Sequence, residues 1–230
     1  MFGLEELPDV IPVFPLTRAL LLPKSQLYLN IFEPRYLEMV EHAREGQGVI
    51  GMIQPLPMEG VGPAGLALDN IGRGPETPPL YGSGCLGMIS SFEQTKDGQV
   101  TLMLTGLSRF DVVEELPQRH LYRELRVSYD NYTEDCGAPP RSPDIDRYRL
   151  EGLLLKSLEA RGLSADWGDF FEQAEDEVLI NELAKYCVTS SGEAQAVLEA
   201  RSLKDRFDLM VNLLEINLAD PSGSADKHYH

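Results

Sequence analysis

The hydrophobic pattern of this chain changes once, near the proline-rich segment 136–143, and this change constrains the fold more than any other feature. Upstream of it, apolar and polar residues alternate with a period of two, which is typical of half-buried strands. The clearest such runs are 27–31 and 100–105, and 86–92 and 125–129 are predicted strands as well. Pro34, followed by apolar residues at helical spacing, predicts one helix in this part. Downstream, the periodic runs have the spacing of amphipathic helices. Strands first and helices afterwards predict an α+β fold in two parts, rather than an alternating α/β sheet.

The upstream part is predicted to form a small β-barrel or barrel-like sheet, because six or so short strands are separated by turns. Pro12 and Pro15 bracket the first strand, which is therefore expected to be short and to lie at a sheet edge. Gly106 interrupts an apolar run, which indicates a bulge or the close approach of another backbone segment. The residues after it, 110–113, are predicted to form a separate strand.

The downstream part is predicted to form a bundle of four or five helices. Asp144 is expected to cap the first helix and Gly162 to end it. Ser190 and Glu193 have the spacing of a capping box at a later helix. The predicted boundaries are 1–136 for the β domain, 137–143 for a linker, 144–220 for the helical bundle and 221–230 for a disordered tail. That tail ends in His228-Tyr229-His230, which is either native or an added remnant.

Composition limits the class of protein. A chain of 230 residues with 43% hydrophobic residues can bury an ordinary globular core. The net charge is −17 and both halves are acidic, so a nucleic-acid partner is not expected. The sequence contains no apolar run long enough to span a membrane and no secretory leader pattern at its start. Cys85, Cys136 and Cys187 are too widely spaced for a disulfide framework or a metal knuckle, which favours a reducing cytoplasm.

A specific signature occupies the first 36 residues. It consists of Phe14-Pro15-Leu16, then Leu22-Pro23, then Ile31-Phe32-Glu33-Pro34-Arg35-Tyr36. Together with Leu80-Tyr81, 84–89, 104–110 and 192–195, this pattern resembles the LON domain. That domain is the N-terminal substrate-binding domain of the ATP-dependent Lon proteases, and it also occurs as a freestanding protein.

The resemblance implies a PUA-like barrel followed by helices. It also implies a protein-binding module that recognises unfolded or extended polypeptides, as an adaptor or chaperone in proteolysis, with a separate protease or ATPase as a further partner. The signature positions are expected to be structural; they are Phe14, Pro15, Leu16, Glu33, Pro34, Arg35, Tyr36, Gly106, Arg109 and Phe110. For Arg35 the alternative is direct recognition of a ligand, rather than a charge-assisted contact that holds the strand-to-helix corner.

No catalytic or cofactor site is expected. The sequence has no Walker A motif, and the chain ends before the ATPase and Ser–Lys protease domains that follow the LON domain in Lon proteases. The segment Gly82–Gly87 matches G-x-G-x-x-G, but a strand follows it where a dinucleotide site requires a helix. His42 and His120 are far apart in the sequence, so no metal site is expected. Two alternatives remain open: an RNA-binding PUA-like protein, and a small hydrolase that uses Cys85 or scattered carboxylates.

The candidate protein-binding surface is the apolar loop Leu20-Leu21-Leu22-Pro23, joined by two flexible methionines, Met52 and Met58. Contiguous exposed apolar residues often mark a binding site, and methionine suits contact with varied partners. The alternative is that these side chains pack in the core.

Overall fold

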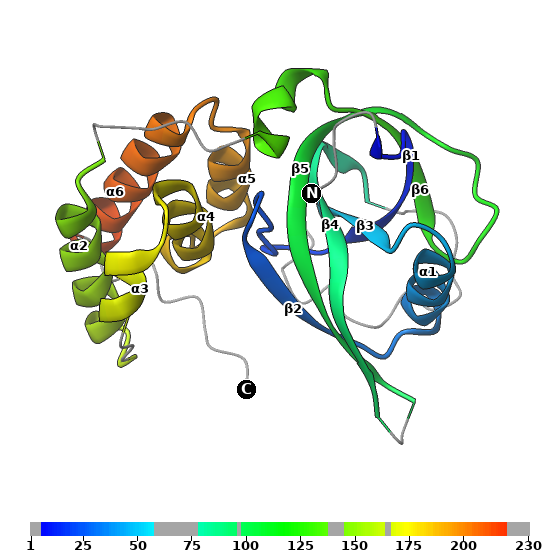
Figure 1. The fold of residues 1–230 in the computed structure, drawn as a ribbon, viewed down its shortest axis with the longest axis horizontal. Helices are drawn as coiled ribbons and strands as arrows, with labels where there is room; N and C mark the ends of the chain where they lie inside the picture. The colour runs from blue at the N-terminus through cyan, green and yellow to red at the C-terminus, as the bar shows by residue number, and fades with distance from the viewer. Residues whose placement is uncertain (1–5, 58–77, 96–97, 138–144, 164–166, 220–230) are drawn as a thin grey trace.

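The computed structural model describes residues 6–57, 78–95, 98–137, 145–163 and 167–219. It places an N-terminal barrel of strands beside a C-terminal group of helices (Figure 1). The strands are β1 (Val10–Pro15), β2 (Gln26–Ile31), β3 (Val49–Pro55), β4 (Leu80–Gln94), β5 (Val100–Glu115) and β6 (Arg123–Ser128). Helix α1 (Pro34–Glu45) follows β2, and the 3-10 helix η3 (Asp130–Cys136) follows β6. The C-terminal helices are α2 (Arg147–Ala160), α3 (Gly168–Gln173), α4 (Asp176–Cys187), α5 (Ser191–Glu199) and α6 (Leu203–Ala219).

The predicted α+β class is confirmed, with a barrel-like sheet ahead of the helices. The boundaries assigned to the two domains remain a prediction, because 138–144 and the tail 221–230 lie outside the described residues. Within the described residues, no helix has both the length and the apolar character needed to cross a membrane.

Strand β5 closes the barrel. The sheet order is β2-β5-β4-β3-β1-β6, and β5 pairs with β6 as well. Its first half, 100–105, pairs with β2, and its second half, from 111 onward, pairs with β6. The prediction of a separate strand at 110–113 was wrong, because register shifts against β4 let one 16-residue strand bend without breaking. Among the described strands, β2 alone pairs on one side only, with β5, so its other edge is open.

Strand β1 is not at a sheet edge, which corrects the expectation drawn from its prolines. It pairs antiparallel with β6 through 10–13 and parallel with β3 through 13–15. Pro12 therefore has a paired residue only on the β6 side and Pro15 only on the β3 side. Each proline can direct its missing N–H toward the unpaired side, which reconciles two prolines with an interior strand. The chain leaves β1 at Leu16, whose N–H donates to the Ile53 carbonyl (3.0 Å).

Gly106 allows a loop to cross the barrel wall at contact distance, as the sequence predicted. The Gly106 N–H donates to the Ser25 carbonyl, and the Lys24 N–H donates to the Gly106 carbonyl, both at 2.9 Å. A Cβ at this position would lie 2.0 Å from the Leu22 carbonyl oxygen. The loop 16–25, between β1 and β2, therefore needs a residue without a side chain beneath it.

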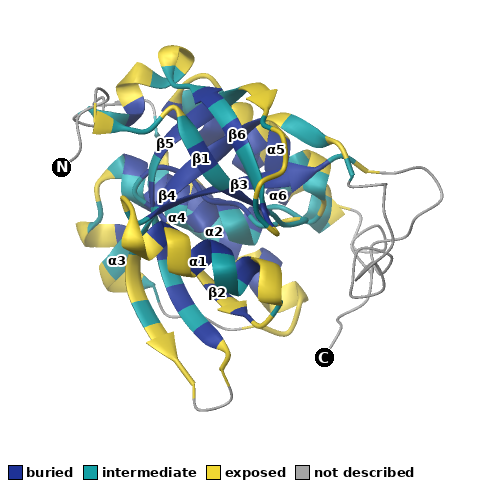
Figure 2. Cartoon of the chain, turned by 90° about the vertical axis from the view of Figure 1, so that its right-hand side faces the viewer, coloured by how far each residue is buried: buried dark blue, intermediate teal, exposed yellow. Residues whose placement is uncertain are grey.

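Two apolar clusters form the core. Figure 2 shows buried residues concentrated in the strands of the barrel. The smaller cluster lies inside the barrel around Phe110, which is fully buried beneath Gly51 and Gly84. The larger one extends from loop 16–25 and α1 into the C-terminal helices. Polar contacts reinforce this junction: Asn181 Nδ2 donates to the Pro23 carbonyl (2.8 Å), and Arg206 Nη1 donates to Asn181 Oδ1 (2.6 Å).

Side chains cap the N-terminal ends of α2, α5 and α6. Asp146 caps α2, since its Oδ1 accepts the Arg149 N–H (3.0 Å); Asp144, the predicted cap, lies outside the described residues. Gly162, with φ +69°, follows the end of α2 as predicted. Ser190 Oγ accepts the Glu193 N–H (3.2 Å) at the start of α5.

Candidate protein-binding site

The apolar loop proposed from the sequence is not an exposed surface. Leu20, Leu21, Leu22 and Pro23 are all buried, and so is Met52 in β3; the leucines are at most 5% exposed. Met58 lies outside the described residues. Loop 16–25, between β1 and β2, packs closely against the barrel because the glycines opposite it have no side chains. A Cβ on Gly87 would lie 2.7 Å from the Leu21 side chain. These leucines therefore belong to the core, and the expectation that they bind other proteins is corrected.

The signature residues around α1 form a compact corner. The Phe14 and Tyr36 rings pack with their centroids 4.1 Å apart. Pro34 begins the helix, and Arg35 Nε donates to Glu33 Oε2 (2.9 Å) while its guanidinium lies 4.6 Å from the centre of the Tyr36 ring. These contacts support the structural interpretation of Arg35. The pair is partly exposed, so it contributes little stability by itself.

Arg109 joins the barrel to the helices. Its guanidinium forms a two-pronged, buried ion pair with Asp135 of η3, with Nε–Oδ2 at 2.9 Å and Nη2–Oδ1 at 2.8 Å. Its remaining nitrogen, Nη1, donates to the carbonyls of Leu198 (3.1 Å) and Ala200 (2.6 Å) at the end of α5. One side chain thus links β5, η3 and α5 through charge-assisted hydrogen bonds.

A groove lies where the barrel meets α3 and α4. Its volume is about 370 Å³. Aromatic and aliphatic side chains form most of its wall, and Lys24 and Glu182 are its charged members. The lining residues are Lys24, Gln26, Trp167, Phe170, Val178, Glu182, Leu183 and Tyr186. The Trp167 and Tyr186 rings pack against each other with centroids 5.0 Å apart, so the apolar wall is a continuous surface.

The groove adjoins the open edge of β2. Gln26, the first residue of β2, has its N–H paired to Glu182 Oε2 (2.9 Å) and its carbonyl paired to Lys185 Nζ (3.3 Å), both on α4. Backbone groups alternate in direction along an antiparallel strand. The N–H and C=O groups of Tyr28 and Asn30 therefore point to the same side as those of Gln26, beyond the part of the edge that α4 covers.

Exposed aromatic side chains accompany this edge. Tyr28 is 68% exposed and Phe32, just after β2, is 53% exposed. The sequence predicted the strand at 27–31 but gave no sign that it was the barrel's open edge. In the sequence, Trp167 and Phe170 show only as apolar residues within the helical part. Their meeting with β2 depends on packing between segments about 140 residues apart.

Cys85 is placed as a core residue. It is 1% exposed in β4, its Sγ donates to the Leu86 carbonyl (3.6 Å), and burial raises the pKa of its thiol. Because the thiolate is the nucleophilic form, a buried thiol with a raised pKa is a poor nucleophile. The G-x-G-x-x-G segment around it lies within β4, so no helix N-terminus follows it. These placements oppose both the hydrolase and the dinucleotide interpretations.

The three thiols should differ sharply in reactivity. Burial raises the pKa of all three thiols, that of Cys187 to about 12, but Cys85 and Cys187 are buried whereas Cys136 is only partly buried. We expect a disulfide reagent at mildly alkaline pH to label Cys136 alone in the native protein and all three cysteines after unfolding. Mass spectrometry of the labelled peptides checks this result. Rapid native labelling of Cys85 would show that β4 opens.

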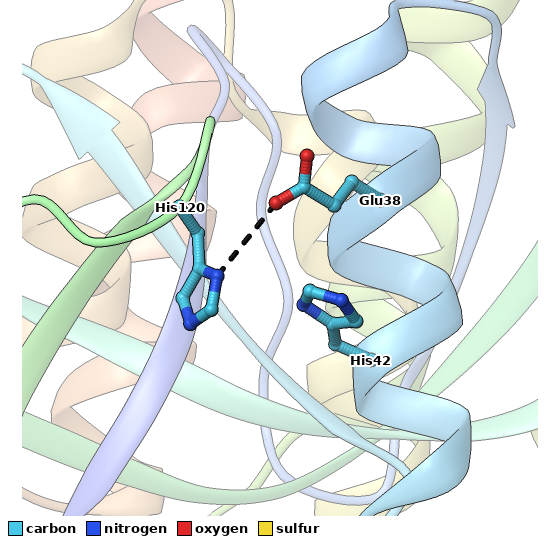
Figure 3. A group of neighbouring side chains, drawn as sticks. All are labelled: Glu38, His42 and His120. Atoms are coloured by element: carbon cyan, nitrogen blue, oxygen red, sulfur yellow. Dashed lines mark ion pairs between the residues drawn. The ribbon is translucent and has the colours of Figure 1, made fainter.

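The structure also brings together two histidines that the sequence separates. His42 and His120 have ring centroids 5.0 Å apart, and Glu38 lies beside both (Figure 3). Their separation in the sequence did not predict this meeting. Glu38 and His42 are four residues apart on α1, a spacing that places both on one helix face and was visible in the sequence. The contribution of His120 could not be read from it.

Comparisons with known proteins agree with the signature. Two relatives are the Lon proteases of Bacillus thuringiensis (20% identical over 212 residues, 90% of this chain) and Dictyoglomus thermophilum (26% over 216 residues, 88% of this chain). The chain spans 24% of the length of each.

Two solved structures show the same fold. One is a Lon N-terminal domain protein from Xanthomonas campestris, with a TM-score of 0.55 and 23% identity over 88% of this chain and 97% of that one. The other is the N-terminal domain of a Mycobacterium avium complex Lon protease, with a TM-score of 0.59 and 13% identity over 90% and 98%. The model of the ATP-dependent protease La (LON) substrate-binding domain matches residues 10–215. The chain therefore belongs to the LON substrate-binding domain family.

Proposed function

We propose that this chain is a non-enzymatic module that binds unfolded or extended polypeptide segments by adding them as a strand to the open edge of β2. The observation that carries the proposal is the continuity between that edge and the apolar groove beside α3 and α4. Membership of the LON substrate-binding family supports a polypeptide ligand.

The two parts of the site have complementary tasks. The outward N–H and C=O groups of Tyr28 and Asn30 offer sequence-independent hydrogen bonds to an added strand. Alternate side chains of that strand point to one face, so apolar residues can contact Trp167 and Phe170 in the groove. Main-chain pairing supplies affinity for any extended segment, and the groove favours apolar ones.

The family and the free thiols support a cellular setting for this module. Relatives that match this chain are Lon proteases, which supports a role as an adaptor or chaperone in proteolysis, with a separate protease or ATPase as partner. Cys85, Cys136 and Cys187 are all free, which supports a reducing cytoplasm.

Asn30→Pro is the direct test of strand addition. Proline removes the Asn30 N–H, which faces the open side, and leaves the pairing between β2 and β5 intact. We expect the affinity for a permanently unfolded protein to fall at least about tenfold, since a hydrogen bond is lost and the ring obstructs the added strand. Trp167 is the only tryptophan in the chain, so its emission reports occupancy of the groove. Titration with a tryptophan-free chain, reduced and carboxymethylated ribonuclease A, gives the affinity.

Asn30→Ala is the matched control. It loses the same side chain, including the contact between Asn30 Oδ1 and Thr101 Oγ1 (3.1 Å), but keeps the backbone N–H. Its affinity should equal that of the unchanged protein at both physiological and high salt. Equal affinity of the proline and alanine variants would refute strand addition at β2. An absence of binding by the unchanged protein would refute the proposed function itself.

A further inference from the structure

A second candidate site lies on α1, apart from the groove. Glu38 and His42 stand one turn apart on the same face of the helix, and His120 faces them from the segment between β5 and β6 (Figure 3). The three side chains offer one carboxylate oxygen and two imidazole nitrogens, all within 4.8 Å of one another. They converge although the three residues come from two segments 78 residues apart.

Contacts that need no ion already hold the segment of His120 against α1. The Leu121 N–H donates to Glu38 Oε1 (3.4 Å), and His120 Nδ1 lies 3.7 Å from the same oxygen. The His120 ring stacks on the buried Tyr122 ring with centroids 5.0 Å apart and planes 9° apart. The cluster is therefore positioned by the fold and does not depend on chance side-chain orientations.

His42 has the hydrogen bond that orients a metal-ligating histidine. Its Nδ1 lies 2.9 Å from the Tyr122 hydroxyl oxygen. When Nδ1–H donates to that oxygen, Nε2 keeps its lone pair for a ligand. Histidines that bind metals almost always donate their other ring N–H to a neighbouring oxygen, which fixes the tautomer and the ring orientation.

We propose that Glu38, His42 and His120 bind one zinc-class transition-metal ion. Two imidazoles and one carboxylate are a ligand set that Zn²⁺ accepts, with a fourth position left for water or a partner's side chain. Ca²⁺ and Mg²⁺ prefer oxygen ligands and fit less well. Tetrahedral Zn²⁺ ligands lie about 3.3 Å apart, so the side chains must close by no more than about 1.5 Å. His42 is exposed and Glu38 and His120 are half-buried, which leaves room for that movement.

The bound ion would tie α1 to the segment between β5 and β6. Without it, the hydrogen bond from Leu121 to Glu38, the contact between Glu38 and His120, and the hydrogen bond between His42 and Tyr122 make that connection. The site does not include β2, α3 or α4, so its test is independent of the proposed polypeptide binding.

The test uses the full chain with His228→Ala and His230→Ala as background, so that His42 and His120 are the only histidines left to ligate the ion. Calorimetric titration with ZnCl₂ should show one ion per chain, and Co²⁺ should give the visible absorption of a tetrahedral site. His120→Ala should abolish both signals. Tyr122→Phe should weaken Zn²⁺ binding by about 10- to 100-fold, as loss of a hydrogen-bond partner of a ligating histidine does.

Glu41→Gln is the matched control. It removes an exposed carboxylate from α1 next to His42, and Zn²⁺ affinity should not change. Circular dichroism verifies that each variant is folded, and His120→Asn replaces His120→Ala if the latter does not fold. An absence of stoichiometric Zn²⁺ binding in the background protein overturns the proposal. Binding that survives loss of His120, or that falls equally with Glu41→Gln, overturns it as well.

Discussion

Replacing Arg109 with methionine should lower the free energy of unfolding by about 3–5 kcal/mol, the range found when one member of a buried ion pair is removed. Arg109 and Asp135 are both nearly inaccessible to solvent, at 7% and 6% side-chain exposure. Methionine keeps much of the side chain's volume but leaves the Asp135 carboxylate buried without its cation. It also removes the donors that hold the Leu198 and Ala200 carbonyls. Urea denaturation monitored by circular dichroism measures the loss.

Two further variants separate charge burial from packing. Arg109→Met combined with Asp135→Leu removes both charges, so it should recover much of the stability that the single variant loses. Arg126→Met removes an arginine that pairs with Glu114 and Asp9 at the exposed barrel surface, and it should change stability little. If Arg109→Met were no more destabilising than Arg126→Met, the junction between barrel and helices would not depend on this pair.

Among glycine-to-alanine substitutions in the barrel, Gly106→Ala should be the most destabilising. We expect it to lower the free energy of unfolding by about 3 kcal/mol or more. The new Cβ would lie 2.0 Å from the Leu22 carbonyl oxygen and 2.7 Å from its carbon. Both are backbone atoms, so no rotamer change relieves the contact and loop 16–25 must shift. The shift would disturb Leu22 in the core and the Asn181 contact with the Pro23 carbonyl. Thermal unfolding and urea denaturation both measure the effect.

Gly82→Ala is the control for this prediction. Gly82 lies in β4, has no positive φ, and would place its Cβ with no atom within 4 Å. Alanine there should be neutral or slightly stabilising, because it restricts the unfolded chain without a clash. Similar melting temperatures for the two variants would mean that loop 16–25 does not rest on Gly106.

Local signals in the sequence predicted much of the fold. The alternation at 27–31 predicted β2, Pro34 marked the start of α1, and Gly162 marked the end of α2. Gly106 predicted a close backbone approach without indicating which segment approaches. These features succeed because turns, caps and strand faces depend on residues that are neighbours in the chain.

The sequence misplaced the binding surface because burial is decided by contacts between distant segments. The local sequence Leu20-Leu21-Leu22 would read the same in an exposed loop and in a buried one. The three leucines are buried because Gly87 and Gly106, far along the chain, leave space for them. The prolines of β1 were likewise compatible with an edge or with two neighbours that each pair with half of the strand.

By itself, the sequence determined the α+β class, the family and the positions of most strands and helices, since periodicity and a dense signature are local properties. Only the tertiary structure decided that β2 is the barrel's open edge, that Trp167 and Phe170 meet it, and that His120 joins Glu38 and His42. The physical reason is that barrel closure and helix docking set these distances. Both depend on which buried surfaces fit together, and that fit is a property of the whole chain.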